Sequence, residues 1–214
     1  TEAIYYVFNT PAYYDTADMD KEAITKIQIP VLAGYTFGGY VADDELGTVY
    51  VDGQGNIIND LYKTVKEDLS LYAQWTANTI TITLDSVNNT ENTFVYYVFD
   101  AEGYYSTNEN GQLSNEITSI TVPTKNGYAF GGYFAQGVAN AYISDAGVID
   151  ANLYNTVSEN TTLIAKWNVV TYTVTLDPAN GTLVPGATQT IEYTIEGTVV
   201  LPEVTREHYE FNGW

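Results

Sequence analysis

The sequence lacks cysteine altogether and is poor in charged residues, and each shortage excludes some classes of protein. With no cysteine, neither a disulfide framework nor a thiolate metal site nor a cysteine nucleophile can form. Charged residues make up 16% of the chain, below the roughly 25% of an average globular protein. Hydrophobic residues reach an ordinary 45%, so the composition predicts a folded chain with a polar, largely uncharged surface.

Basic residues are scarce even among the charged ones. Lys and Arg number 7 against 27 Asp and Glu, which gives a net charge of -20. Such a surface repels phosphate backbones and anionic lipid headgroups, so we expect no nucleic-acid binding and no direct membrane binding. No initiator Met and no apolar stretch of signal-peptide or membrane-span length is present. We therefore expect the chain to be a portion of a longer polypeptide.

Histidine is nearly absent too, which limits the possible catalytic chemistry. A Ser-His-Asp arrangement could form only at His208, where an exposed or partly packed histidine is the more common case. The run Asp43-Asp44-Glu45 could supply the carboxylate pair of a glycoside hydrolase. However, the corresponding place later in the chain reads Ala135-Gln136-Gly137. We therefore predict no catalytic residues and a protein that is not an enzyme.

Two acidic loops have a faint resemblance to calcium-binding loops. They are Asp18-Met19-Asp20 and Asp52-Gly53-Gln54-Gly55-Asn56, and neither carries the full series of ligands with a closing Glu. Ordinary turns capped by Asp side chains explain both better, so we predict no metal site and no cofactor. Lysines and asparagines would permit an isopeptide crosslink, although no spacing in the chain favours one.

What the chain does contain is a repeat. The phrase GYTFGGY at 34–40 returns as GYAFGGY at 127–133, and TITITLD at 79–85 returns as TYTVTLD at 171–177. Trp75 and Trp167 lie as many residues apart as the two TITITLD-type strands do. This period is about the length of a small domain. We predict three units: residues 1–76 form a repeat without its first strand, residues 77–167 a complete repeat, and residues 168–214 the N-terminal part of a third.

The pattern within each unit is typical of β-structure. Ile80, Ile82 and Leu84 alternate with threonines, which places them on one face of a strand. The segment 69–75 alternates in the same way, with four residues on one face: Leu69, Leu71, Ala73 and Trp75. Turn signals at 52–56 and 145–147 and short helices near 59–64 and 152–156 complete the unit. The expected class is mostly β (α+β), with four to five strands and one short helix per repeat.

The glycine-aromatic phrase itself looks like scaffold. Tyr35 and Phe37 share a strand face and are expected in the core, while Gly38-Gly39 allows close approach to a neighbouring strand. A phosphate-binding loop would need glycines that open a long helix, followed by Lys. Neither feature is present.

Together these residues resemble the internalin-type B-repeat, also called the Listeria/Bacteroides repeat. The resemblance rests on the T-Y-T-V-T-L-D strand, the G-Y-x-F-x-G phrase and the closing strand that ends in Trp75 or Trp167. It implies a small β-grasp-like unit, used in tandem arrays in secreted or wall-attached bacterial surface proteins. One departure is that Tyr40 and Tyr133 stand where the family usually has Trp.

The most unusual feature of the composition is its excess of tyrosine, part of which occurs as adjacent pairs, or doublets. Tyr5-Tyr6 and Tyr13-Tyr14 recur as Tyr96-Tyr97 and Tyr104-Tyr105. Adjacent strand residues face opposite ways, so one ring of each doublet is expected to pack inward and the other to face outward. Outward rings could stack on sugars or anchor a protein partner, or simply form cross-strand pairs. Our candidate ligand-binding residues are Tyr13, Tyr14, Tyr104 and Tyr105.

These observations predict a structural and adhesive role. We expect a stalk or spacer at the surface or cell wall of a bacterium. The alternative is a module that binds polysaccharide or a host protein through its tyrosines. Because the first unit lacks its opening strand and the third lacks its later ones, we also expect either head-to-tail pairing between chains by strand addition or a local rearrangement of the two ends.

Overall fold

The computed structural model describes residues 3–43, 46–58, 60–88, 91–107 and 113–214, and its regular structure is almost entirely β. Two helices of four residues occur, Leu61–Thr64 (α1) and Leu153–Thr156 (α2). Within the described residues, no helix is long and apolar enough to cross a membrane. The predicted mostly β class is thus confirmed.

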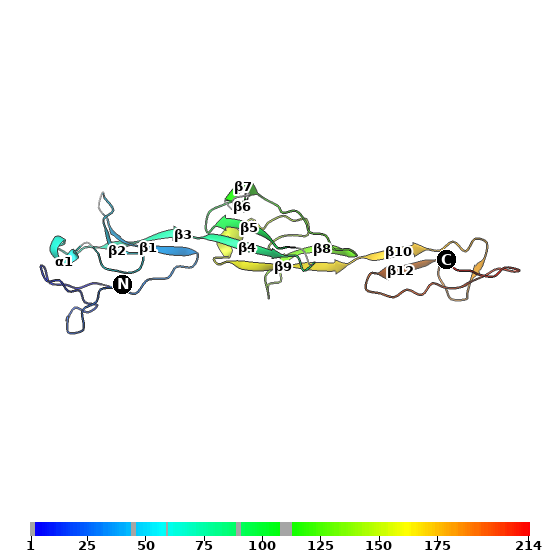
Figure 1. Cartoon of the computed structure of the whole chain (residues 1–214), viewed down its shortest axis with the longest axis horizontal. Helices are drawn as coiled ribbons and strands as arrows, with labels where there is room; N and C mark the ends of the chain where they lie inside the picture. Colours follow the sequence, from blue (N-terminus) through cyan, green and yellow to red (C-terminus); the bar gives the residue numbers. More distant parts are fainter. Residues whose placement is uncertain (1–2, 44–45, 59, 89–90, 108–112) are drawn as a thin grey trace. The chain divides into compact units, whose positions relative to one another are not determined.

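The first repeat contains a three-stranded antiparallel sheet in the order β2-β1-β3 (Figure 1). Its strands are Tyr35–Ala42 (β1), Val49–Asp52 (β2) and Leu71–Ala77 (β3). Residues of β3 alternate between half-buried and exposed as predicted. Leu69 was expected on the same face, but it precedes the strand and is exposed. β3 is one of the two edge strands of this sheet.

The paired glycines of the glycine-aromatic phrase create a bulge in the sheet. The register of β1 against β3 shifts between Phe37 and Gly39, and Gly39 has φ 124° with the carbonyl oxygen of Val51 2.3 Å from where its Cβ would lie. Phe37 is buried and its ring packs edge-on against the rings of Tyr40 and Trp75. The scaffold interpretation therefore holds for the Phe-Gly-Gly-Tyr part of the phrase.

The second repeat has a six-stranded sheet in the order β7-β6-β5-β4-β9-β8 (Figure 1). The strands are Thr79–Asp85 (β4), Thr93–Val98 (β5), Tyr104–Thr107 (β6), Leu113–Ile117 (β7), Tyr128–Phe134 (β8) and Thr161–Val169 (β9). Six strands exceed the predicted four to five because the tyrosine-rich segment adds the β6-β7 pair. Ile80, Ile82 and Leu84 are buried as predicted.

The bulge recurs in this sheet. The register of β8 against β9 shifts between Phe130 and Tyr133, and Phe130 packs on Tyr133 and Trp167 as Phe37 does on its partners. The indole nitrogen of Trp167 also donates a 2.7 Å hydrogen bond to the carbonyl oxygen of Ser86. The closing tryptophan therefore ties β9 to the end of β4.

The third repeat consists of two small antiparallel sheets. One pairs Thr171–Thr175 (β10) with Thr190–Thr194 (β12), and the other pairs Thr182–Leu183 (β11) with Val204–Thr205 (β13). Leu176 and Val204 are its buried apolar residues among those described.

Contacts divide the chain into two compact units. The first comprises residues 1–82, 95–117 and 151–161, and the second comprises residues 83–94, 118–150 and 162–214. This division follows contacts between strands and cuts through the second repeat. The repeat boundaries at 76/77 and 167/168 stay a prediction.

Candidate functional site

A tight turn precedes β1 and again precedes β8. Tyr35 donates its backbone N–H to the carbonyl oxygen of Leu32, and Tyr128 donates to Lys125, both at 3.1 Å. The residue before each tyrosine is a glycine with positive φ, 81° at Gly34 and 77° at Gly127, a conformation that disfavours other residues. We call residues 32–35 and 125–128 the glycine–tyrosine corners.

A second kind of turn follows β5 and β12. The N–H of Ala101 donates to the carbonyl oxygen of Val98, and the N–H of Gly197 donates to that of Thr194, both at 3.1 Å. Each turn presents an apolar residue followed by a carboxylate: Phe99-Asp100 in one and Ile195-Glu196 in the other. We call residues 98–101 and 194–197 the docking turns.

Each docking turn lies on the glycine–tyrosine corner of the preceding repeat. A Cβ placed on Gly34 would lie 2.1 Å from Cδ1 of Phe99, and one on Gly127 would lie 2.7 Å from Cβ of Ile195. Real Cβ atoms essentially never come closer than 3.0 Å to such atoms. Glycine is therefore required at the two corners for two reasons. It leaves room for the apolar residue of the docking turn, and it permits the positive φ of the corner itself.

Hydrogen bonds fix the same contact. The hydroxyl of Tyr35 donates to Oδ2 of Asp100 at 2.7 Å, and that of Tyr128 donates to Oε1 of Glu196 at 2.5 Å. Each carboxylate raises the pKa of its tyrosine, chiefly through this hydrogen bond. Tyr35 was predicted to enter the core; instead it is half-buried and its hydroxyl reaches the next repeat.

Backbone hydrogen bonds support both junctions. The N–H of Asn78 donates to the carbonyl oxygen of Gly34 at 2.8 Å, and that of Val170 donates to Gly127 at 2.9 Å. At the first junction, Phe99 in turn donates to the carbonyl oxygen of Asn78 at 2.9 Å. Every junction contact involves residues of a single compact unit. The docking turns were not predicted from the sequence. The string YYVF, which occurs twice and is followed by Asn or Asp, could have indicated the docking turn at 98–101.

The tyrosine doublets form inward clusters that recur in two repeats. In the first repeat the ring centroids of Tyr6 and Tyr13 lie 5.9 Å apart and those of Tyr13 and Tyr62 lie 6.0 Å apart. The matching distances in the second repeat are 5.9 Å for Tyr97–Tyr104 and 6.3 Å for Tyr104–Tyr154. Burial raises the pKa of Tyr6 and Tyr13, as expected for phenols removed from water.

The hydroxyls at the inner end of these clusters are also equivalent. Tyr6 donates to the carbonyl oxygen of Val65 at 3.1 Å, and Tyr97 donates to that of Val157 at 2.7 Å. Each of these carbonyls belongs to the residue that follows a short helix, α1 or α2. The inward tyrosines therefore attach the helical segment to the sheet side of each repeat.

The remaining member of each doublet pairs with its counterpart across the strands. Tyr5 lies opposite Tyr14, and Tyr96 lies opposite Tyr105. Of the four candidate ligand-binding residues, Tyr104 is 7% exposed and Tyr13 is half-buried in its cluster. Tyr14 and Tyr105 are half-buried members of the cross-strand pairs. That any of the four binds a ligand stays a prediction.

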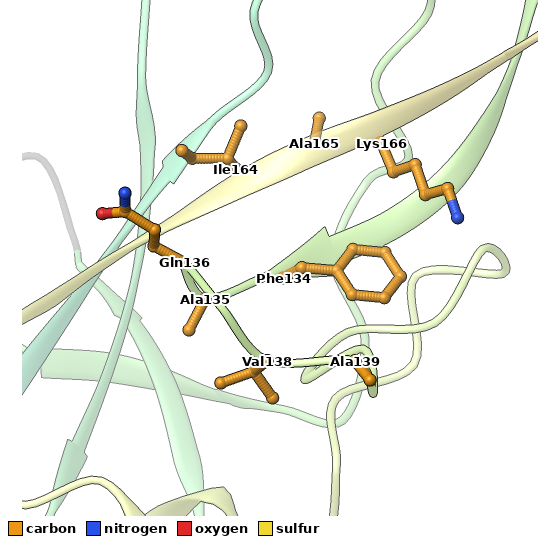
Figure 2. Close-up of a pocket in the computed structure, with 8 residues that line it drawn as sticks. All are labelled: Phe134, Ala135, Gln136, Val138, Ala139, Ile164, Ala165 and Lys166. Atoms are coloured by element: carbon orange, nitrogen blue, oxygen red, sulfur yellow. The ribbon is translucent and has the colours of Figure 1, made fainter.

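A shallow hollow lies beside β8 and β9 (Figure 2). It is lined by Phe134, Ala135, Gln136, Val138, Ala139, Ile164, Ala165 and Lys166. Figure 2 shows Val138 and Ala139 on the loop after β8, with Ile164 and Ala165 on the facing strand. Its one titratable group, Lys166, lies 5.6 Å from the centroid of the Phe134 ring. The hollow is mostly apolar, with Gln136 and Lys166 as its polar lining residues.

Among the described residues, the catalytic and metal candidates do not assemble into a site. The side chain of His208 is 86% exposed, and its Nε2 lies 3.5 Å from Oε1 of Glu207. Asp43 is exposed, and its neighbours Asp44 and Glu45 lie outside the described residues. Over the described ranges, no three residues among His, Cys, Asp and Glu cluster in a way that could hold a metal ion.

The loop at Asp52 is a turn capped by that side chain, as predicted. Its Oδ1 accepts from the N–H groups of Gln54 and Asn56, and its Oδ2 accepts from the side-chain amide of Asn56, at 2.7 to 2.9 Å. These bonds lower the pKa of Asp52, with the Asn56 amide as the largest cause.

Fold and junctions together define a tandem array of small β repeats. The chain belongs to the Listeria-Bacteroides repeat domain family, whose pattern matches residues 9–74, 97–166 and 172–214. The resemblance seen in the sequence is thereby confirmed.

Two relatives come from the bacterium Evansella cellulosilytica. A protein named "Putative Gly-rich membrane protein" is 28% identical over 85% of this chain and 18% of its own length. Another, named "Putative membrane protein", is 26% identical over 97% of this chain and 27% of its own length. The chain thus spans about a fifth to a quarter of these relatives. No solved structure matches it.

Proposed function

We propose that the chain is a non-enzymatic spacer within a bacterial surface protein, built from β-grasp-like repeats that hold another domain away from the cell. The observation that carries this proposal is the junction: one docking turn lies on one glycine–tyrosine corner at two successive places. An array that repeats one contact between neighbours gains length without a new type of interface.

Other features support a role at the cell surface. Both relatives are named as membrane proteins and are several times longer than this chain, so repeats of this kind occur there beside other segments. A net charge of -20 favours a hydrated array that stays clear of anionic lipid headgroups. The one histidine is solvent-exposed and the hollow on β8–β9 is mostly apolar, which supports a role without catalysis.

A replacement experiment tests the spacer role. In the parent protein, these 214 residues are exchanged for an unrelated folded array of similar length, and antibodies label intact cells to verify display. A spacer predicts that display and the parent protein's adhesion are retained. Loss of adhesion with normal display contradicts the spacer role, and labelling only after permeabilisation contradicts the surface location.

A second candidate function is ligand binding through the tyrosines, either to a polysaccharide or to a host protein. The observation that favours it is the cross-strand pair, Tyr5 with Tyr14 and Tyr96 with Tyr105, at equivalent positions in two repeats. Paired aromatic rings are suited to stacking on sugar rings. A glycan array tests this: binding that is lost in Tyr96→Ala/Tyr105→Ala but kept in Tyr72→Ala, a change at an exposed tyrosine outside these pairs, would support it.

A further inference from the structure

A third docking turn exists in the chain, at residues 7–10. The N–H of Thr10 donates to the carbonyl oxygen of Val7 at 2.9 Å, as in the two docked turns. Asn9 has φ 63° where Asp100 has 56°. Each of these two residues donates its backbone N–H to the carbonyl oxygen of a tyrosine in the neighbouring short helix. Asn9 donates to Tyr62 at 2.7 Å, and Asp100 donates to Tyr154 at 3.0 Å. This turn therefore has the conformation of the docked turn at 98–101.

The apolar residue of this third turn is available to a partner. Phe8 occupies the position that Phe99 has in the docked turn, and it is 41% exposed. The Nζ of Lys66, in the same repeat, lies 5.7 Å from the centroid of its ring. Asn9 replaces Asp100, and its side-chain carbonyl can accept a hydrogen bond from a tyrosine hydroxyl as the carboxylate does.

A third corner exists as well, at residues 206–209. Tyr209 donates its N–H to the carbonyl oxygen of Arg206 at 3.1 Å, the same bond as in the other two corners. Arg206 lies 4.0 Å from the Tyr209 ring, as Lys125 lies 4.3 Å from Tyr128. Tyr209 is 66% exposed, whereas its two equivalents under docking turns are half-buried.

The third corner differs at one position. His208 has φ 65° and stands where the docked corners have Gly34 and Gly127. At those corners a Cβ would lie 2.1 and 2.7 Å from the apolar residue of the docking turn. His208 has such a Cβ, so a docking turn cannot approach this corner in the same way without a shift.

We propose that residues 7–10 are a docking surface for the glycine–tyrosine corner of another repeat of this kind, and that His208 prevents the third corner from accepting this turn from a second copy of the chain. The partner is defined by its chemistry: a positive-φ glycine that leaves room for Phe8, followed by a tyrosine whose hydroxyl reaches Asn9. The proposal does not depend on a surface location or on the spacer role.

The test creates the missing glycine. In the variant His208→Gly we expect self-association that rises with protein concentration in sedimentation velocity, with shifts of the Phe8, Asn9 and Tyr209 amide signals in NMR spectra. Salt near 0.15 M screens the repulsion between two acidic chains beyond about 8 Å. Adding Phe8→Ala to this variant should abolish the association. Adding Val31→Ala, a change at an apolar residue that is 94% exposed outside the turn, should leave it unchanged.

A matched control separates the Cβ from the imidazole. His208→Ala removes the ring but keeps the clashing atom, so its association should be about tenfold weaker than that of His208→Gly, or weaker still, because overpacking of this size is costly. Three results would each overturn the proposal. They are no concentration dependence in His208→Gly, equal association of His208→Ala, and association that survives Phe8→Ala. The last result would point to strand addition at the sheet edges instead.

Discussion

The hydroxyl of Tyr35 donates a 2.7 Å hydrogen bond to the carboxylate of Asp100, which lies 65 residues further along the chain. Tyr128 and Glu196 have the same relationship, 68 residues apart. Both pairs join neighbouring repeats through a tyrosine hydroxyl and a carboxylate, so the junction is a repeated element of the fold. It is also the contact that the proposed spacer role depends on.

Titration of these tyrosines tests the junction. The hydrogen bond raises the pKa of Tyr35 and Tyr128, so each contributes stability that is present below the unfolded value of about 10 and is lost as pH rises through the folded value. In a spectrophotometric titration, Tyr35→Phe/Tyr128→Phe should lose two of the groups that ionise above pH 10. Loss of two groups that titrate at the ordinary pKa would show that the junction bonds do not form in solution.

Two glycines with the same backbone conformation test the packing of the junction. Gly127 has φ +77° and contacts Ile195, whereas Gly137 has φ +78° and has no atom within 4 Å of a built Cβ. Gly137→Ala should cost about 1 kcal/mol from the positive φ alone. Gly127→Ala should cost about 1–3 kcal/mol more because Ile195 must move. Urea denaturation followed by tryptophan fluorescence measures both, and equal costs would mean that Ile195 does not lie on the corner.

The tyrosine doublets predict opposite outcomes for adjacent residues. Tyr104→Ala should destabilise the second repeat by about 3–5 kcal/mol, because it removes a buried ring from the cluster. Tyr105→Ala should cost about 1 kcal/mol, the size of a cross-strand pair. Similar costs in thermal or urea unfolding would contradict the assignment of one inward and one outward ring.

The repeat boundaries predict the behaviour of fragments. Residues 77–167 contain five strands of the second sheet in full and β9 up to Trp167, and they should unfold cooperatively when expressed alone. Residues 1–76 contain β1, β2 and all of β3 except Ala77, with β3 at one edge of the sheet, and should be less stable in urea. Equal stability of the two fragments would show that the boundaries are wrong.

The strand pattern and the core could be predicted from sequence because they depend on local alternation. Ile80, Ile82 and Leu84 needed only a period of two to be assigned to the core. The close approach of Gly38-Gly39 to a neighbouring strand was likewise expected from the freedom of glycine, whereas the register shift beside it was found only in the structure.

The junction could not be predicted in this way, since its partners are far apart in sequence. Nothing near Tyr35 indicates that its hydroxyl meets Asp100, so its place two residues before Phe37 suggested a core residue instead. Similarly, the doublets showed that one ring of each pair faces inward, but which ring does so depends on the register of Tyr96 opposite Tyr105.

The most direct test of the account is ¹⁵N relaxation of the intact chain. It compares the amides of β1 and β3 with those of β5, which belong to different repeats and the same compact unit. A stable junction predicts a single rotational correlation time for the three strands, and separate, shorter times after Tyr35→Phe combined with Gly34→Ala. Separate correlation times in the unmodified chain would show that neighbouring repeats reorient independently, which would contradict a coupled array.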